Sequence, residues 1–251
     1  MALADDDPLA LARSRWFASC EPELQAALRA LGHGLSLVDG ELLFHQGQRS
    51  AGLCCVLSGA LHVGRLQPDG TQSLLAWLEA GHWFGEISLL DGQPRTHDVR
   101  SDGMTRLWLV PEVALVAWLD EHPRHWRSIA RLACAKLRQS FEVLEDIARL
   151  PLEARLAKRL LQVAQGYGEQ DLTPQDASTP RRLRLPQEQL ALMMGVSRQT
   201  VNKALKSLEA QGHLALRYGG IELLDPQALA ALGQNPAHET AAARPHPDRG
   251  L

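Results

Sequence analysis

Residues 186–224 read PQEQLALMMGVSRQTVNKALKSLEAQGHLALRYGGIELL, and this stretch decides how the C-terminal part of the chain folds. Gln187–Met194 is predicted to form a helix of about two turns. Gly195 ends that helix, because glycine permits the positive φ of a tight turn. Ser197 can cap a second helix, whose first amides would otherwise lack partners. The apolar positions of this second helix, which we expect to be buried, are Val201, Leu205 and Leu208.

The remaining positions of the second helix are polar or basic. In the first turn of a recognition helix, Arg can bond guanine twice, and Gln or Asn can bond adenine twice. Lys neutralises phosphates, and Ser and Thr hydroxyls can donate to them. A plain helical hairpin with solvated charges is the alternative, but a β-hairpin over Leu214–Arg217 and Ile221–Leu224 adds a wing. We therefore predict a winged helix-turn-helix that binds double-stranded DNA through Ser197, Arg198, Gln199, Thr200, Asn202, Lys203 and Lys206.

The N-terminal half has a different pattern of apolar and turn residues. A short helix is predicted over Glu21–Leu31, and from Leu35 to Val110 the chain breaks into short apolar runs. Glycines and other turn residues punctuate these runs about every 6–12 positions, which indicates an antiparallel β sandwich or barrel. The clearest strands are Leu53–Leu57, Leu61–Leu66, Ser73–Leu78 and Thr105–Val110.

Residues 81–100, GHWFGEISLLDGQPRTHDVR, carry a candidate ligand site. Gly85 and Glu86 follow an aromatic strand, and Ile87–Leu90 can form one helical turn that offers free amides to an anion. The Arg95 fork suits a phosphate, the Glu86 carboxylate can accept from a ribose hydroxyl, and Thr96 adds donors. Together these groups suit a ribose-phosphate. The alternative is an ion pair between Arg95 and Glu86 in a structural loop.

The middle of the chain is predicted to be helical. Glu112–Glu121 should end near His122-Pro123, and no Gly or Pro interrupts residues 124–150. In that long helix, residues spaced alternately three and four apart form a seam typical of a coiled coil. We expect this seam to make a homodimer, the alternative being a helix packed on its own domain. The seam runs from Trp126 to Ile147, with its interface at Ala130, Ala133, Leu137, Ser140 and Leu144.

Three further segments complete the chain. A helix is predicted over Pro151–Gln165, since Pro151 suits a helix start and Gly166 follows its end. Residues 166–182, GYGEQDLTPQDASTPRR, are polar and rich in helix breakers, and we expect a linker there rather than a core element. The tail after Leu232 is expected to be disordered.

The composition and the missing motifs exclude several classes of protein. The 251 residues are 45% hydrophobic and 22% charged with a net charge of −3, which is ordinary for a globular protein. No apolar run approaches the roughly 20 residues of a membrane span, and the acidic start does not resemble a secretory signal, so we expect a cytoplasmic protein without a membrane partner. None of the four cysteines forms a C-x-x-C pair, and no metal-spaced His cluster, catalytic triad or P-loop is present. We therefore expect no metal, no resident cofactor and no enzyme.

The order of β module, long helix and winged helix-turn-helix resembles the catabolite-activator and fumarate-nitrate-regulator (Crp-Fnr) superfamily of bacterial transcription factors. FGEISLLDGQPRT is similar to its phosphate-binding cassette, GVSRQTVNKALKSLE to its recognition helix, and LRQSFEVLEDIARL to its long helix. The resemblance covers residues 15–232 and implies an α+β fold. Its parts are a cyclic-nucleotide-binding β-roll of jelly-roll type (15–123), a dimerisation helix (124–150), a winged helix-turn-helix domain (151–232) and a tail (233–251).

The resemblance also implies roles for particular residues. In cyclic-AMP-responsive members, the positions of Gly85, Glu86, Arg95 and Thr96 hold the ribose and cyclic phosphate, and that of Ser140 touches the adenine. The full predicted effector set is Gly85, Glu86, Ile87, Ser88, Arg95, Thr96 and Ser140. A homodimer on a near-palindromic site, acting on RNA polymerase as an activator or a repressor, is implied as well. Gln199 and Lys203 depart from the cyclic-AMP receptor, which has Glu and Arg there, so the half-site is expected to differ.

The sequence does not decide the identity of the effector. The cassette suits a cyclic mononucleotide such as cyclic AMP, although relatives with similar cassettes respond to cyclic di-GMP or to no ligand. An iron–sulfur cluster is not expected, because Cys20 is the only cysteine in the N-terminal region where the oxygen-sensing branch holds one. A competing function is a nucleotide-sensing regulatory subunit that does not bind DNA, and the winged motif argues against it.

Overall fold

The structure is a computed structural model that describes residues 11–66, 72–165 and 181–234. Its N-terminal part is built on a six-stranded antiparallel sheet with the central order β1-β6-β3-β4, in which β2 also pairs with β6 and β5 with β3. The strands are β1 (His33–Leu37), β2 (Leu42–Phe44), β3 (Gly52–Leu66), β4 (Gln72–Glu79), β5 (Trp83–Phe84) and β6 (Asp98–Pro111). The antiparallel β module predicted from the sequence is therefore confirmed.

One strand prediction is wrong. Leu53–Leu57 and Leu61–Leu66 are not separate strands joined by a turn, because both lie in the single long strand β3. Gly59 between them has φ +84, and the register against β6 shifts twice between Val56 and Ala60. Glycine adopts this φ without strain, so the chain makes a β-bulge and continues instead of reversing.

The long strands separate two apolar clusters. Cys54 and Cys55 are neighbours on β3, and successive side chains of a strand point to opposite faces. Cys55 packs in the cluster that contains Trp83 and Leu115, whereas Cys54 packs with Phe44 and other residues inside the roll. Both thiols are buried, so each packs as a small apolar residue on its own side of the strand.

Helices cover one end of the sheet and lead away from it. Glu112–Glu121 is helical as predicted, and the helix predicted over Glu21–Leu31 begins at Pro22, with Glu21 as its N-cap. The long helix begins at Trp126 rather than Arg124, because Pro123–His125 forms a 3-10 turn. The elements are α2 (Arg15–Ser19), α3 (Pro22–Leu31), α4 (Glu86–Asp91), α5 (Glu112–Glu121), η1 (Pro123–His125) and α6 (Trp126–Arg149).

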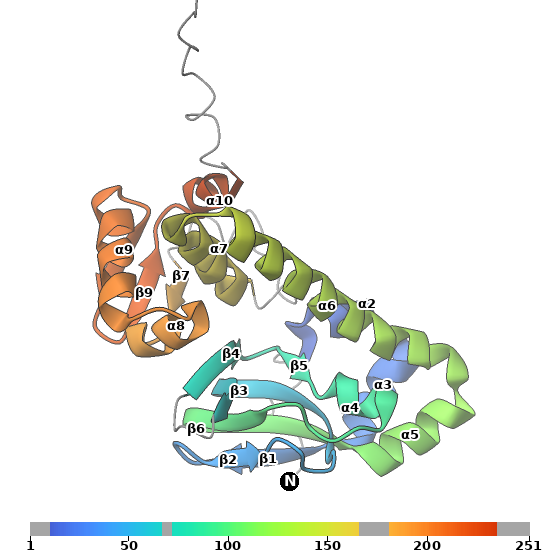
Figure 1. Cartoon of the computed structure of the whole chain (residues 1–251). Coiled ribbons are helices and arrows are strands. Elements are labelled where there is room, and N and C mark those ends of the chain that lie inside the picture. Colours follow the sequence, from blue (N-terminus) through green and yellow to red (C-terminus); the bar gives the residue numbers. More distant parts are fainter. Residues whose placement is uncertain (1–10, 67–71, 166–180, 235–251) are drawn as a thin grey trace, which may run out of the picture.

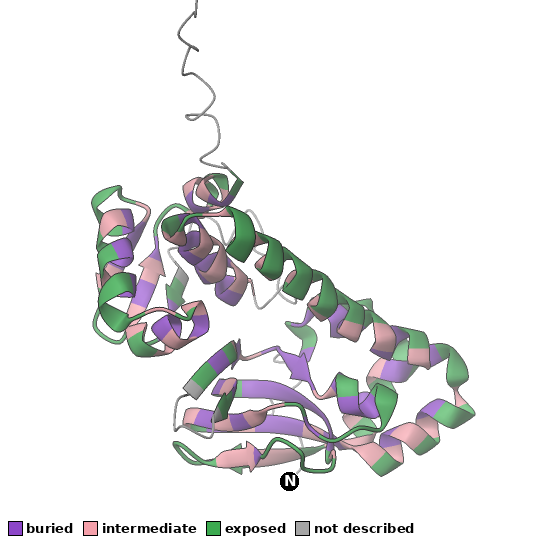
Figure 2. Ribbon diagram, viewed as in Figure 1, coloured by how far each residue is buried: buried purple, intermediate pink, exposed green. Residues whose placement is uncertain are grey.

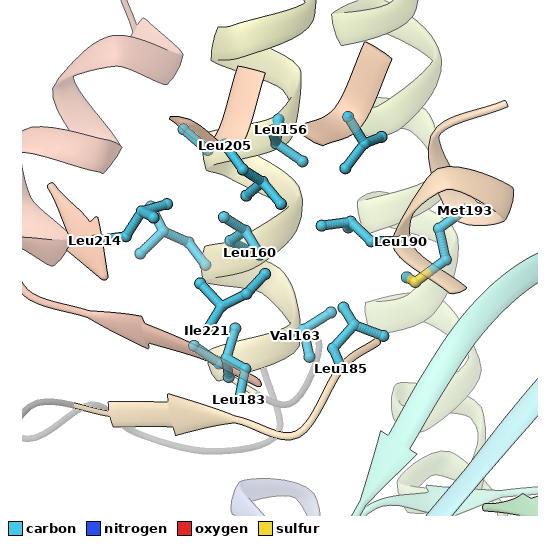
Figure 3. Close-up of a cluster of buried hydrophobic side chains, with 14 of the residues drawn as sticks. Leu156, Leu160, Val163, Leu183, Leu185, Leu190, Met193, Leu205, Leu214 and Ile221 are labelled. Atoms are coloured by element: carbon cyan, nitrogen blue, oxygen red, sulfur yellow. The ribbon is translucent and has the colours of Figure 1, made fainter. Parts of the chain in front are cut away.

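The C-terminal part is a compact winged helix-turn-helix. The predicted bounds of α8, the cap at Ser197 and the hairpin are confirmed within one residue. Leu160, Leu190, Leu205 and Ile221 lie in one buried cluster, which Figure 3 shows in close-up. The elements are α7 (Leu152–Ala164), β7 (Arg181–Leu183), α8 (Gln187–Met194), α9 (Arg198–Ala210), β8 (Leu214–Arg217), β9 (Gly220–Leu223) and α10 (Pro226–Gln234).

Two predictions about this part need correction. Arg181 and Arg182, expected in a linker, belong to strand β7, because they pair with β9 in a three-stranded sheet. The expected disordered tail, 233–251, begins inside helix α10, which the sequence analysis missed and which runs to Gln234. Residues 166–180 and 235–251, where the rest of these two predictions falls, lie outside the described residues.

Figure 1 shows α6 running from the β module toward the C-terminal helices. Helix α8 also packs directly against β4, and Leu74 and Trp77 of β4 belong to the buried cluster of the C-terminal part. The two parts of the chain are thus joined by α6 and by an apolar contact. Over the described ranges, no helix is both long and apolar enough to cross a membrane.

Candidate functional site

The cassette is organised around the turn at Gly85. This glycine has φ +102 and stands immediately before α4, which spans Glu86–Asp91 where one helical turn was predicted over Ile87–Leu90. A Cβ atom at Gly85 would lie 2.7 Å from Arg95 Nη1 and 2.7 Å from the Gly52 carbonyl oxygen. Only glycine meets both the backbone conformation and the close approach, so this residue lets Arg95 pack under the turn.

Arg95 is buried beneath the cassette, with 4% of its surface exposed. Its Nη2 donates to the Gly52 carbonyl at 2.6 Å, its Nη1 donates to the Gly85 carbonyl at 3.2 Å, and its guanidinium lies over the Phe44 ring. Burial lowers the pKa of Arg95 from its ordinary value. Among the described residues Arg95 makes no bond to Glu86, so the structure does not contain the ion pair considered as an alternative.

Glu86 instead pairs with the long helix. The Glu86 side chain is 3% exposed, and Lys136 Nζ donates to its Oε2 at 2.9 Å and to the Trp83 carbonyl at 2.6 Å. Lys136 was missed by the sequence analysis, although it lies one helical turn before Ser140 and therefore shares its face of α6. This ion pair, buried on the Glu86 side, connects the cassette directly to α6.

All seven predicted effector residues line a single cavity of about 550 Å³. The cassette and α6 both line it, and Lys136 and Gln139 contribute on the α6 side. Thr96 is exposed at the rim, and the Ser140 hydroxyl donates to the Lys136 carbonyl at 3.0 Å. The set that the structure brings together is Gly85, Glu86, Ile87, Ser88, Arg95, Thr96 and Ser140.

The predicted DNA-binding residues lie on the outer face of α9. Ser197 caps this helix by accepting from the Thr200 amide at 3.1 Å. Asn202 is only half-exposed, and among the described residues its Oδ1 has no hydrogen-bond partner. The opposite face of α9 is buried through Val201, Leu205 and Leu208, as predicted. The exposed members are Ser197, Arg198, Gln199, Thr200, Lys203 and Lys206.

The wing carries polar and aromatic groups that the sequence analysis did not assign. Tyr218 at its tip is 98% exposed. Arg182 Nη2 donates to the Tyr218 carbonyl at 2.5 Å, and Arg217 pairs with Glu222 at 2.8 Å. The Arg182 contact depends on the pairing of β7 with β9, which no local pattern signals.

The expected dimer face of α6 is partly exposed in the single chain. Ala130 and Ala133 are half-buried, whereas Leu137 and Leu144 are 52% and 64% exposed. Phe141, which was not in the predicted set, is 55% exposed. Ser140 and Leu144 also line the effector cavity. The exposed apolar stripe is thus Leu137, Phe141, Leu144 and Ile147.

The cysteines form no metal centre in the part of the chain that the structure describes. There, no three or more His, Cys, Asp or Glu side chains are placed to hold an ion. Cys20, Cys54 and Cys55 are buried, and burial raises the pKa of both Cys20 and Cys54 to about 12. Cys134 is exposed on α6.

Comparison with known proteins defines the class. Residues 35–122 match the cyclic nucleotide-binding domain, and residues 154–232 match the Crp-like helix-turn-helix domain. A chain that joins these two domains is a transcription regulator with a cyclic nucleotide-binding module. This protein is 31% identical to the CRP-like cAMP-activated global transcriptional regulator of Mycobacterium tuberculosis. The match extends over 220 residues, which are 88% of this chain and 96% of that relative. The chain belongs to the CRP/FNR family, which consists of transcription regulators rather than enzymes.

Solved structures share the fold. A CRP/FNR-family transcriptional regulator from Thermus thermophilus matches with a TM-score of 0.61 and 24% identity, over 81% of this chain and all of that one (100%). The c-di-GMP responsive global regulator CLP of Xanthomonas campestris matches with a TM-score of 0.62 and 21% identity, over 81% and 99% of the two chains. These likenesses confirm the predicted fold class.

Proposed function

We propose that the chain forms a homodimer that binds a near-palindromic DNA site and responds to a cyclic nucleotide held in the β module. The observation that carries the proposal is the capped helix α9, whose exposed face presents Arg198 and Gln199 at its first turn. Such a helix start fits the major groove. The cavity lined by the cassette and α6 supports the ligand-responsive half.

On DNA, the two classes of side chain have different tasks. Arg198 is proposed to bond guanine and Gln199 adenine, because their donor and acceptor patterns match those base edges. Lys203 and Lys206 neutralise phosphates, together with the hydroxyls of Ser197 and Thr200. Two copies of α9 related by a two-fold axis place their half-site centres about one helical turn, roughly 34 Å, apart.

In the cavity, a cyclic mononucleotide is the proposed effector. Arg95 uses two of its N–H groups on backbone carbonyls, so further donors of its guanidinium face a phosphate. Glu86 accepts from the ribose hydroxyl, and Thr96 donates to the phosphate at the rim. The relative from Mycobacterium tuberculosis is named as cAMP-activated, which supports cyclic AMP as the first ligand to test.

The proposed dimer forms along α6. The exposed apolar stripe that includes Leu137, Phe141 and Leu144 favours a second copy of the same helix, since two such stripes can interlock. The bond from Lys136 to Glu86 supports the transmission of ligand binding into this helix. The family relation implies RNA polymerase as the further partner, with the dimer acting on DNA in the cytoplasm.

Calorimetry with cyclic AMP, cyclic GMP and cyclic di-GMP tests the effector assignment. Arg95→Leu is expected to weaken binding about a hundredfold, because a charge-assisted phosphate contact is lost. Arg100→Leu, five residues later on β6 and outside the cavity, serves as the control and should bind as the wild type does. Binding of cyclic di-GMP alone would replace the mononucleotide assignment, and unchanged binding by Arg95→Leu would move the site elsewhere.

A further inference from the structure

The effector cavity is not confined to the β module and α6. Arg159 and Gln162 of α7 and Met193 of α8 also line it. Arg159 and Gln162 are three residues apart, so they share one face of α7. Helices α7 and α8 belong to the segment that matches the Crp-like helix-turn-helix domain. The DNA-binding domain therefore forms one wall of the ligand cavity.

The cavity is long in the direction of α6. Its lining on this helix begins at Lys136, which bonds Glu86, and continues through Ser140 and Val143 to Ile147. From Lys136 to Ile147 the helix advances by eleven positions, a rise of about 16 Å. The groups that suit a cyclic phosphate lie at the Lys136 end, whereas Ile147 also shares a small neighbouring depression with Arg159 and Gln162. A ligand bound by Arg95 thus has a second polar group to meet at the α7 end.

Arg159 is a half-buried cation at the α7 end of the cavity. Among the described residues it makes no hydrogen bond and no ion pair, whereas the adjacent Lys158 bonds Asp146 at 2.6 Å. A partly desolvated guanidinium is costly unless acceptors satisfy it, and it presents five N–H donors in a planar fork. An acceptor-rich ligand in the cavity meets that need.

We propose that Arg159 is a further effector-binding residue, which donates to acceptor atoms at the end of the nucleotide remote from Arg95. This inference rests on the proposed effector site. The acceptors are base atoms in a cyclic mononucleotide or the second phosphate in a cyclic dinucleotide. In either case the ligand bridges the β module and α7, so its binding restrains the DNA-binding domain directly and not through α6 alone.

Calorimetry of Arg159→Ala with cyclic AMP, cyclic GMP and cyclic di-GMP tests the proposal. Affinity for the ligand that the wild type binds should fall about tenfold, the usual effect of losing one hydrogen bond to a charged group. Arg155→Ala is the matched control, because Arg155 lies one turn earlier on α7 and lines only the small neighbouring depression, not this cavity. Arg159→Lys should recover part of the affinity, and thermal unfolding should show that all variants are folded.

A second readout separates ligand contact from a structural role. DNA affinity of Arg159→Ala without ligand should equal that of the wild type, whereas the change caused by saturating ligand should shrink severalfold. Wild-type ligand affinity in Arg159→Ala overturns this proposal and leaves the effector site at Arg95 intact. No binding of any of the three nucleotides by the wild type overturns the effector assignment itself, and this proposal with it.

Discussion

The two parts of helix α6 have opposite environments. At its start, Ser128, Ile129 and Leu132 are buried in the β module, and Trp16 Nε1 donates to the Ser128 carbonyl at 2.6 Å. Farther along, Leu137 and Phe141 are more than half exposed, and Figure 2 shows the outer side of this part as largely exposed. The first part anchors the helix to its own domain, and the second presents apolar surface that a single chain leaves uncovered.

Lys136 lies where these two parts meet. On its inner side it bonds Glu86 of the cassette, and one residue later Leu137 begins the exposed stripe. The contrast indicates different roles along one helix: the first part attaches it to the β module, and the second part serves both the proposed ligand contact and the proposed dimer, because Ser140 and Leu144 of the expected interface also line the cavity.

The largest effect on folding is expected in the anchored part. Leu132→Ala should lower the free energy of unfolding by about 2–5 kcal/mol, because it removes a fully packed side chain and leaves a cavity. Chemical denaturation measures this loss. Leu144→Ala, on the exposed part, is the matched control and should cost much less within the monomer. Equal losses in monomeric protein would remove the distinction between the two parts.

The exposed part should govern assembly. Leu137→Asp combined with Leu144→Asp would place carboxylates in the proposed interface and split the dimer, since a buried charge without a partner is strongly unfavourable. Light scattering should show a monomer with wild-type helix content. Glu142→Gln combined with Glu145→Gln changes the charge at exposed positions of the same helix and should remain dimeric. A dimer in the double Asp variant would contradict the assigned interface.

The ion pair between Lys136 and Glu86, where the two parts of α6 meet, should have an intermediate effect on stability. Lys136→Ala leaves the Glu86 carboxylate buried without its cation, which should cost about 1–3 kcal/mol. Glu86→Gln in the same background should restore part of the loss, because a neutral amide is cheaper to bury than an unpaired charge. Thermal unfolding of the single and double variants measures the coupling. Purely additive effects would mean that the two side chains do not interact.

The smallest effect concerns thiol reactivity. Only the thiolate reacts, and a pKa of about 12 keeps Cys20 and Cys54 protonated at pH 8, where burial also shields them. Titration with a thiol reagent should therefore show one fast cysteine, which Cys134→Ser removes. Since Cys134 lies one turn before the exposed stripe, it should react faster in the double Asp variant than in the dimer. A fast phase that survives Cys134→Ser would place the reactive thiol elsewhere.

The helix-turn-helix could be predicted to within a residue because its signals are local. Gly195 has φ +64 and ends α8, and the Ser197 side chain caps α9, so each boundary depends on residues beside it. The cassette was predictable for the same reason. Gly85, Glu86 and Arg95 are close in sequence, and the positive φ of Gly85 and the start of α4 at Glu86 are set by residues beside them.

What could not be predicted depends on distant partners. Glu86 and Lys136 are 50 residues apart, and strand β7 exists because residues 181–183 pair with β9. Gly59 illustrates a different difficulty, since glycine with a positive φ serves both turns and bulges. Whether the chain reverses there depends on its pairing with β6, not on the residues beside it.

Selection from randomised DNA tests the central claim, sequence-specific binding through α9, most directly. The wild type should enrich a near-palindromic site, and Arg198→Ala should lose preference at one base pair per half-site, at a cost of about 1–3 kcal/mol. Lys206→Ala should keep the same site while weakening all sequences alike and flattening the salt dependence, because it contacts phosphate. An unchanged preference in Arg198→Ala, or no preferred site for the wild type with any candidate effector present, would contradict the account.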